Sequence, residues 1–268
     1  MKIFYNPFPI FRSSRTPAGL YARQKWLGDS AEPGWQKDFQ ETVRALLNGQ
    51  SGDGSWHQSS FETVRRLFGL HLTIRDINSA IADALHWLTA LASSDDFIRE
   101  ETSEGISLDL LRELPFTAGQ SRLTLICATL FLSTIFHQHD DPAVMACYGN
   151  LSRRIIGSKG DILSWGDRSN LLRAFVVHPR YANDVATAAL VDVLAEVQDA
   201  SGCWPEPIPF FQIVNALAHL RDRTSNHQWN KALPFIINTQ NIDGSWGDDD
   251  REWNTFLVVH ALRNKGCL

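Results

Sequence analysis

Apolar and polar residues alternate along most of the chain with the period of an α-helix. In one clear case, Ile81, Leu85, Leu88 and Leu91 recur at three- and four-residue intervals. Segment 120–136 is apolar on almost every face, which predicts a buried helix. Almost nothing has the two-residue alternation of a strand, so the sequence predicts an all-α fold. The expected helices are 20–27, 39–47, 61–72, 77–92, 120–136, 142–156, 170–177, 183–197, 210–220, 229–239 and 253–264.

A short phrase with Gln, Gly and Trp at fixed spacing separates several of these helices. Near the C-terminus it reads Gln240-Asn241-Ile242-Asp243-Gly244-Ser245-Trp246. Segment 50–56 repeats it closely, segment 198–204 keeps only the Gln, Gly and Trp, and segment 160–165 keeps the Trp but lacks the Gln. The Trp residues of the last three turns, Trp165, Trp204 and Trp246, are spaced by about 40 residues, which is typical of α-hairpin repeats. A single hairpin cannot bury its own apolar face, so the hairpins are expected to stack.

The count of helices predicts five stacked hairpins in one domain, residues 35–268. Residues 1–34 contain too many aromatic side chains for a solvated tail. We interpret them as an arm that packs on the domain and supplies a cap or a partial sixth unit. The repeated turn is interpreted as scaffold, because a Gln amide can bond free backbone groups at helix ends while it packs on a Trp ring.

The turn Gln-x-x-Asp-Gly-Ser-Trp, followed by the helical segment 254–262, resembles the Gln–Trp repeats of squalene–hopene and oxidosqualene cyclases. It is also similar to the β subunit of protein prenyltransferases. The resemblance covers residues 39–264. It implies an α/α toroid, a partial (α/α)5–6 barrel in which paired helices form two concentric rings. The helix before each turn would be outer, the helix after it inner, and the central cavity would hold a polyisoprenoid chain.

The catalytic groups that this resemblance implies are missing from their expected places. Class II cyclases protonate an alkene with an Asp-x-Asp-Asp motif, and the nearest match here is Gln138-His139-Asp140-Asp141, which lacks the first Asp. Asp141 followed by Pro142 is typical of a helix N-cap instead. The prenyltransferase zinc site needs an Asp-x-Cys pair and a His-Thr pair. Segment 205–209 has no Cys, and Asn254-Thr255 stands where His-Thr would be, so neither a metal site nor a cofactor is expected.

Four carboxylates are the candidate catalytic acids. Asp248, Asp249 and Asp250 follow the last turn and precede an expected inner helix, which would place them at the rim of the cavity. There they can act as a proton donor or as a weakly specified Mg²⁺-assisted diphosphate site, or they can simply complement the helix dipole. Glu62 is the fourth candidate, after the first turn.

Polar and aromatic residues at the starts and inward faces of the expected inner helices are the candidate ligand-binding groups. They are His57, Arg65, Gln120, Arg122, Arg173, Gln212, Asn215, Trp253 and Asn254. Arg65, Arg122 and Arg173 can pair with an anionic head group. For Asn215 and His260 the alternative is an internal polar network that braces the inner ring. Aromatic residues such as Phe68 and Phe256 can line a terpene cavity or belong to an ordinary core.

Charge and composition restrict the classes of partner. The formal net charge is −5 and no basic block occurs, so nucleic acid is not an expected partner. The four cysteines are scattered without a C-x-x-C pair, which argues against a disulfide framework. The N-terminus has no unbroken apolar run, and the longest apolar stretch, 123–136, is too short to span a bilayer. A cytoplasmic protein without a transmembrane segment is expected.

Three hypotheses of function remain. The first is a terpene cyclase-like or prenyltransferase-like protein that binds an isoprenoid or another apolar ligand, and that as an enzyme would be a cyclase with a non-standard acid. The second is a non-catalytic toroid that serves as a binding module or as the subunit of a protein partner. The third is a carbohydrate-active α/α toroid, which requires two facing carboxylates.

Overall fold

The computed structural model describes residues 3–93, 111–158 and 163–268. In these ranges the secondary structure is helical, apart from isolated bridges beside Trp56, and the all-α prediction is confirmed. The helices are α1 (Pro17–Ala22), α2 (Pro33–Leu47), α3 (Ser60–Thr73), α4 (Ser79–Ser93), α6 (Ser121–Ile135), α7 (Pro142–Ser158), α8 (Trp165–Phe175), α9 (Val185–Val197), α10 (Phe210–Leu217), α11 (Arg223–Asn238) and α12 (Arg251–Asn264). Short 3₁₀ or π turns occur at Pro9–Phe11, Arg23–Leu27, Asp29–Ala31 and Tyr181–Asn183.

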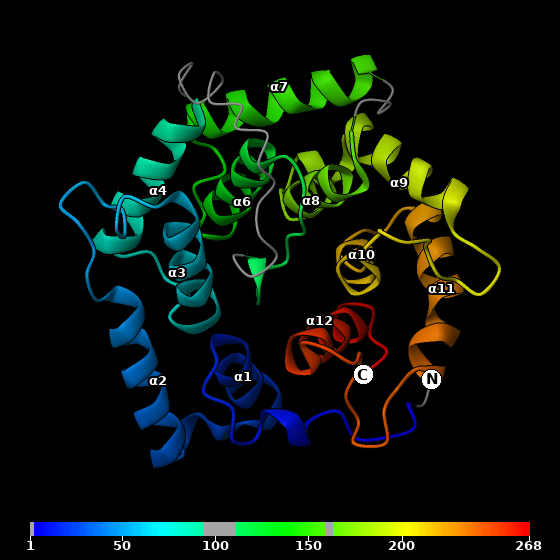
Figure 1. Cartoon of the computed structure of the whole chain (residues 1–268), viewed down its shortest axis with the longest axis horizontal. Helices are drawn as coiled ribbons and strands as arrows, with labels where there is room; N and C mark the ends of the chain where they lie inside the picture. Colours follow the sequence, from blue (N-terminus) through cyan, green and yellow to red (C-terminus); the bar gives the residue numbers. More distant parts are fainter. Residues whose placement is uncertain (1–2, 94–110, 159–162) are drawn as a thin grey trace.

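Six helices contact one another in a closed cycle. Its order is α1, α3, α6, α8, α10, α12 and back to α1. Figure 1 shows these helices on the inside, with α2, α4, α7, α9 and α11 around them. Each outer helix packs on inner neighbours, as α4 does on α3 and α6. We call segments 50–56, 198–204 and 240–246, which keep the Gln, Gly and Trp, the complete turns. The helix before each complete turn therefore lies outside, and the helix after it lies inside.

The N-terminal segment completes both layers. It runs along the side of the molecule between α11 and α2, where Figure 1 shows no outer helix. It then enters α1, which packs between α3 and α12 in the inner cycle. The sequence predicts a helix at 20–27, but α1 begins at Pro17 because the Thr16 side chain accepts a hydrogen bond from the Gly19 N–H and caps it.

Caps also explain where other helices begin. Helix α11 begins at Arg223 rather than at 229, because Asp222 accepts a hydrogen bond from the Ser225 N–H. Helix α8 begins at Trp165 rather than at 170, because Ser164 and Asp167 form a capping box. Asp141 caps α7, as its sequence context predicted, by accepting from the N–H groups of residues 143 and 144. The expected connection 97–109 and the first half of the partial turn 160–165 lie outside the described residues.

The three complete turns tie each hairpin to the next element by the same hydrogen bonds. The Gln240 amide nitrogen donates to the carbonyl of Gly244 at 3.0 Å and to that of Tyr5 at 2.9 Å. The Tyr5 N–H donates back to Gln240 Oε1 at 2.9 Å. The equivalent bonds run from Gln50 to Gly54 and Ala80, and from Gln198 to Gly202 and Gln228. These bonds give each Gln a structural role. The bonds between Gln240 and Tyr5 link the C-terminal hairpin to the N-terminal segment.

Each complete turn also needs a glycine. Gly244 has a φ of +88°, and a Cβ built there would lie 1.9 Å from the carbonyl oxygen of Asn6. Gly54 and Gly202 have φ values of +90° and +89°, and their Cβ atoms would meet the backbones of Asp83 and Lys231 in the same way. The backbone of the neighbouring element therefore passes directly over each turn.

Candidate functional site

Aromatic side chains from different inner helices meet at the centre of the cycle. Trp253 stacks on Phe256 with ring centroids 5.2 Å apart, and its edge contacts Phe68 at 5.8 Å. Phe68 also contacts Phe131 on α6 at 6.1 Å. Helices α3 and α12 are not neighbours in the cycle, because α1 lies between them, so the Phe68–Trp253 contact joins them on the inner side of α1. We call these four residues the aromatic wall. The buried Trp253 Nε1 has no hydrogen-bond partner.

Beside the aromatic wall lies a group that we call the central polar cluster. It consists of His71, Arg75, Arg173, Asn215, His219 and His260. These residues come from the C-terminal halves of α3, α8, α10 and α12 or directly follow them. The clearest link is a hydrogen bond of 2.6 Å from Arg173 Nη1 to Asn215 Oδ1. The Arg173 guanidinium carbon also lies 4.9 Å from the ring centre of Phe131, which connects the cluster to the aromatic wall.

The hydrogen bonds of Asn215 assign the tautomer of His260. Because Asn215 Oδ1 accepts from a cation, its amide nitrogen must face the carbonyl of Leu257, at 2.9 Å, and His260 Nδ1, at 3.3 Å. His260 Nδ1 is then an acceptor, and the neutral ring carries its proton on Nε2. The Asn264 amide lies 3.5 Å from the same Nδ1 atom and is consistent with this assignment. His260 therefore presents an N–H donor on its other side.

Burial keeps the imidazoles of the cluster neutral. Burial, with a smaller contribution from the nearby Arg75 and Arg173 charges, lowers the pKa of His71 to about 3. Burial and the Arg173 charge lower the pKa of His260 to about 4. The pKa of His219 is also lowered, chiefly by burial. All three rings nevertheless keep part of their surface accessible to solvent.

The two arginines carry charge without a carboxylate partner. Only 7% of Arg173 is exposed, and burial lowers its pKa to about 9, which leaves it charged at neutral pH. Among the described residues, neither Arg173 nor Arg75 forms an ion pair. Arg173 Nε and two nitrogens of Arg75, Nε and Nη2, are buried without a hydrogen-bond partner. Aromatic rings and the negative ends of the helix dipoles offset part of this cost.

The backbone at Arg75 is also unusual. Its φ of +61° lies in the left-handed region that favours glycine. The guanidinium carbon lies 4.3 Å from the ring centre of Tyr21, a residue of α1. An arginine at this position therefore carries a backbone cost of about 1 kcal/mol.

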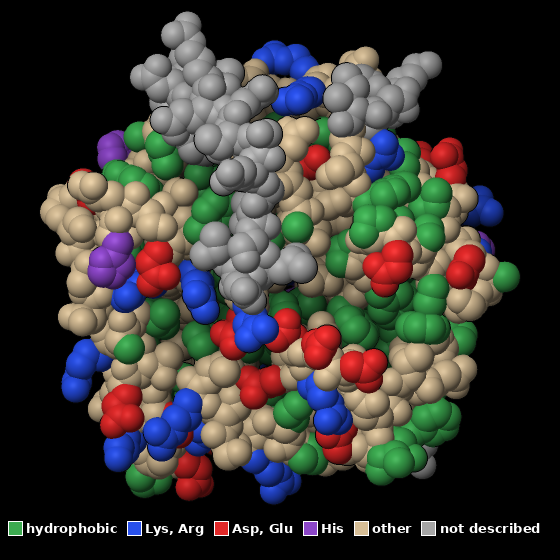
Figure 2. All heavy atoms as spheres, viewed as in Figure 1, with side chains coloured by type: hydrophobic (Ala, Val, Ile, Leu, Met, Phe, Trp, Pro, Cys, Tyr) green, Lys and Arg blue, Asp and Glu red, His purple; other side chains and the backbone are tan. Residues whose placement is uncertain are grey.

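A second group of charged residues lies where the inner helices begin. Asp250 pairs with Arg112 at 3.6 Å. Burial raises the pKa of Glu113, the Glu252 and Asp250 carboxylates raise it further, and Arg65 opposes them. Asp250 and Arg65 were candidates from the sequence, whereas Glu113 and Glu252 were missed. Figure 2 shows acidic and basic side chains interspersed on one face of the molecule.

The remaining sequence candidates have other surroundings. Glu62 pairs with Arg66 at 2.7 Å, and Arg66 donates to carbonyl groups at the end of α2. The Asn254 amide donates to the Asp249 carbonyl at 2.8 Å. Three further candidates, Arg122, Gln212 and Asn254, are partly buried. The exposed candidates are His57, Arg65, Gln120, Asp248 and Asp249.

Sequence reasoning found Arg173, Asn215 and Trp253 but did not single out His71, Arg75 or His219. Helical spacing could have found His71, because it lies three residues after Phe68 on the same face of α3. Arg75 and His219 lie beyond the ends of α3 and α10, so helical spacing does not place them.

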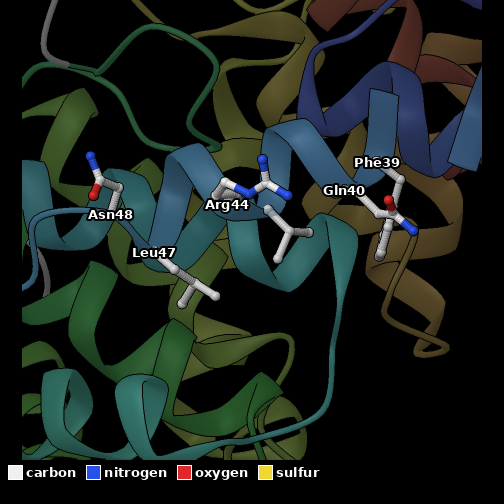
Figure 3. Close-up of a pocket in the computed structure, with 6 residues that line it drawn as sticks. Phe39, Gln40, Arg44, Leu47 and Asn48 are labelled. Carbon is white, nitrogen blue, oxygen red and sulfur yellow. The ribbon is translucent and has the colours of Figure 1, made fainter. Parts of the chain in front are cut away.

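The larger surface hollows lie away from this site. One of about 540 Å³ follows the outer helix α2 and is lined by residues such as Phe39, Arg44 and Leu47 (Figure 3). Another lies on α11. In the described ranges, no three His, Cys, Asp or Glu side chains come together as metal ligands. No helix in these ranges has both the length and the apolar character to cross a membrane.

Comparison with known proteins supports the fold only. No protein-family model matches the chain, and no curated protein matches it. A solved structure described as a protein from Actinoplanes matches with a TM-score of 0.59 and 15% sequence identity. The match covers 94% of this chain and 89% of that one, so nearly the whole helical arrangement has a counterpart.

Proposed function

We propose that this chain is an α/α toroid of the terpene cyclase and prenyltransferase type, and that it binds an isoprenoid or similar apolar ligand inside its inner ring. The contact between Phe68 and Trp253 on the inner side of the ring is the observation that carries the proposal. It joins two helices that are not neighbours into one apolar surface, and apolar surface with a few polar groups is typical of a small-molecule site. The closed cycle of inner helices and the repeated turns support the toroid.

Binding of farnesol, an uncharged isoprenoid alcohol, tests this function. Trp253 should report binding through its fluorescence, because its ring belongs to the aromatic wall. Substituting Phe256→Ala removes the ring stacked on Trp253 and should weaken farnesol binding by about tenfold, the loss expected from an aromatic contact of about 1.4 kcal/mol. Phe39→Ala, on the outer helix α2, is the matched control. Absence of farnesol binding to the folded wild-type protein would contradict the proposal.

A second candidate function is proton-initiated cyclisation by an acid at the rim. The raised pKa of Glu113 favours it, because a raised pKa lets a carboxyl group keep its proton to a higher pH, as a general acid requires. The central polar cluster offers no acid of its own among the described residues. Incubation with squalene and with geranylgeranyl diphosphate, followed by mass spectrometry, tests this activity. A product formed equally well by Glu113→Gln would rule out Glu113 as the donor.

A further inference from the structure

The central polar cluster has a composition that its surroundings do not explain. Structural arginines in a protein interior are normally paired, because an unpaired buried charge is costly. Arg173 is almost fully buried, has one neutral partner in Asn215, and keeps Nε unpartnered. Arg75 adds a second unpaired guanidinium in a backbone conformation that disfavours it. Both arginines act on the same two rings, His71 and His260, and two such residues around one pair of rings indicate a site whose counter-charge comes from outside the chain.

The groups around the two arginines include hydrogen-bond donors and positive charges but no carboxylate among the described residues. Arg173 and Arg75 are donors only, and the tautomer of His260 places an N–H on Nε2. Among the described residues, the charged groups that act on His71 and His260 are Arg75 and Arg173, and those that act on His219 are Arg173, Arg221 and Lys265. No carboxylate acts on any of the three rings within those ranges. Positive charge and N–H donors without a carboxylate are suited to an oxyanion.

From this arrangement we propose that the central polar cluster binds the oxyanion head group, a phosphate or a carboxylate, of an amphipathic ligand. Its apolar chain would lie along the aromatic wall, so this inference rests on the proposed function. Arg173 provides the main contact through its unpartnered Nε, and Arg75 and His260 Nε2 donate to the remaining oxygens. Asn215 positions Arg173 and His260 together by bonding both.

The location separates this site from the rim acids. The cluster occupies the C-terminal halves of the inner helices, whereas Asp250, Glu113 and Glu252 lie where those helices begin. An anionic head group at the rim would meet these three carboxylates together with Arg112 and Arg65. At the central polar cluster it would meet two guanidinium groups and neutral imidazoles. The charge distribution therefore orients the ligand, with its head group at the cluster and its apolar chain toward the rim.

Three ligands with the same chain test the proposal: farnesyl phosphate, farnesoic acid and farnesol. Wild-type protein should bind at least one of the two anions about tenfold more tightly than farnesol, and the comparison of the anions identifies the preferred head group. Arg173→Met should abolish this preference, because it removes the guanidinium that pairs with an anionic head group, and farnesol should still bind. Arg75→Met, at a partly exposed position, serves as the second variant if Arg173→Met does not fold. Arg44→Met on the outer helix α2 is the control and should keep the preference.

The outcomes distinguish the two proposals. Equal affinity for all three ligands would overturn the oxyanion site and leave the proposed function standing. Failure of all three to bind would overturn both. A preference for an anion that survives both Arg173→Met and Arg75→Met would place the head group elsewhere and overturn the site. Loss of the preference in either variant, with farnesol binding intact, supports it.

Discussion

The repeated turns and the central polar cluster both bury polar side chains, but they differ in how far those side chains have hydrogen-bond partners. In the last turn, Gln240 makes three hydrogen bonds to the backbone of Tyr5 and Gly244. In the cluster, Arg173 and Arg75 keep buried nitrogens without partners. Satisfied polar groups stabilise a fold, whereas unsatisfied ones cost stability and need another reason to persist. We infer that the turns hold the ring together and that the cluster is maintained for binding.

The largest expected effect is at the glycine of the last turn. Gly244→Ala should lower the free energy of unfolding by about 3 kcal/mol or more, because the new Cβ would overlap the Asn6 carbonyl in a left-handed backbone. Gly266→Ala is the matched control, since Gly266 also has a positive φ but no atom within 4 Å of its Cβ position. It should cost about 1 kcal/mol. Equal losses in urea unfolding would show that the close approach at Gly244 does not matter.

The next effect removes the turn's hydrogen bonds. Gln240→Ala leaves three backbone groups of Tyr5 and Gly244 without their partner and should cost about 2 kcal/mol in the same unfolding assay. Gln36→Ala removes an exposed glutamine and should change stability by less than about 0.5 kcal/mol. If the Gln240→Ala protein were as stable as the Gln36→Ala protein, the hydrogen bonds of Gln240 would not stabilise the fold.

Acid should destabilise the protein through the central polar cluster. The pKa of His260 is about 4 in the folded state and 6.5 as a model value, so the unfolded state binds the proton first as the pH falls. Stability present above pH 6.5 is therefore lost between pH 6.5 and 4, and at pH 5 the loss is about 2 kcal/mol for this ring. His260→Asn should flatten the pH dependence of unfolding by about that amount, whereas the exposed His86→Asn should not. Parallel pH profiles of the wild type and His260→Asn would contradict a buried neutral His260.

The smallest effect on stability is expected at Arg173. Arg173→Met removes a buried unpaired charge, which favours the folded state, but leaves Asn215 without its donor, which disfavours it. The gain and the cost should cancel to within about 1 kcal/mol in the ligand-free protein. Its thermal unfolding should therefore resemble that of Arg44→Met. A loss as large as that of Gln240→Ala would show that Arg173 belongs to the scaffold, like the turn.

The sequence predicted the scaffold better than the site for a physical reason. Helical periodicity and a turn with fixed Gln, Gly and Trp positions are local signals, and they placed most helices within a few residues. The start of α11 was missed because it depends on the cap at Asp222 and not on an apolar pattern. His71 and Arg75 were missed because their meaning depends on Arg173 and His260, which the ring brings close from distant parts of the chain. Contacts between residues on different inner helices depend on the tertiary structure, and the periodicity of apolar residues within one helix does not predict them.

The rim illustrates the same limit. Asp250 was chosen because acids follow the last turn, but Glu113 precedes α6 and joins Glu252 only in the folded chain. Glu62 looked similar to Asp250 in sequence, yet it pairs with Arg66, four residues along the same helix. Local sequence therefore identified Glu62 and Asp250 as acids. It did not show that each pairs with an arginine, or that Asp250 raises the pKa of Glu113.

A crystal structure of the protein with farnesyl phosphate tests the central claim most directly. The phosphate should lie within hydrogen-bond distance of Arg173 Nε, with Arg75 and His260 Nε2 on its other oxygens and the farnesyl chain against Trp253 and Phe256. A phosphate bound at the rim beside Arg112, with Arg173 Nε still unpartnered, would contradict the account.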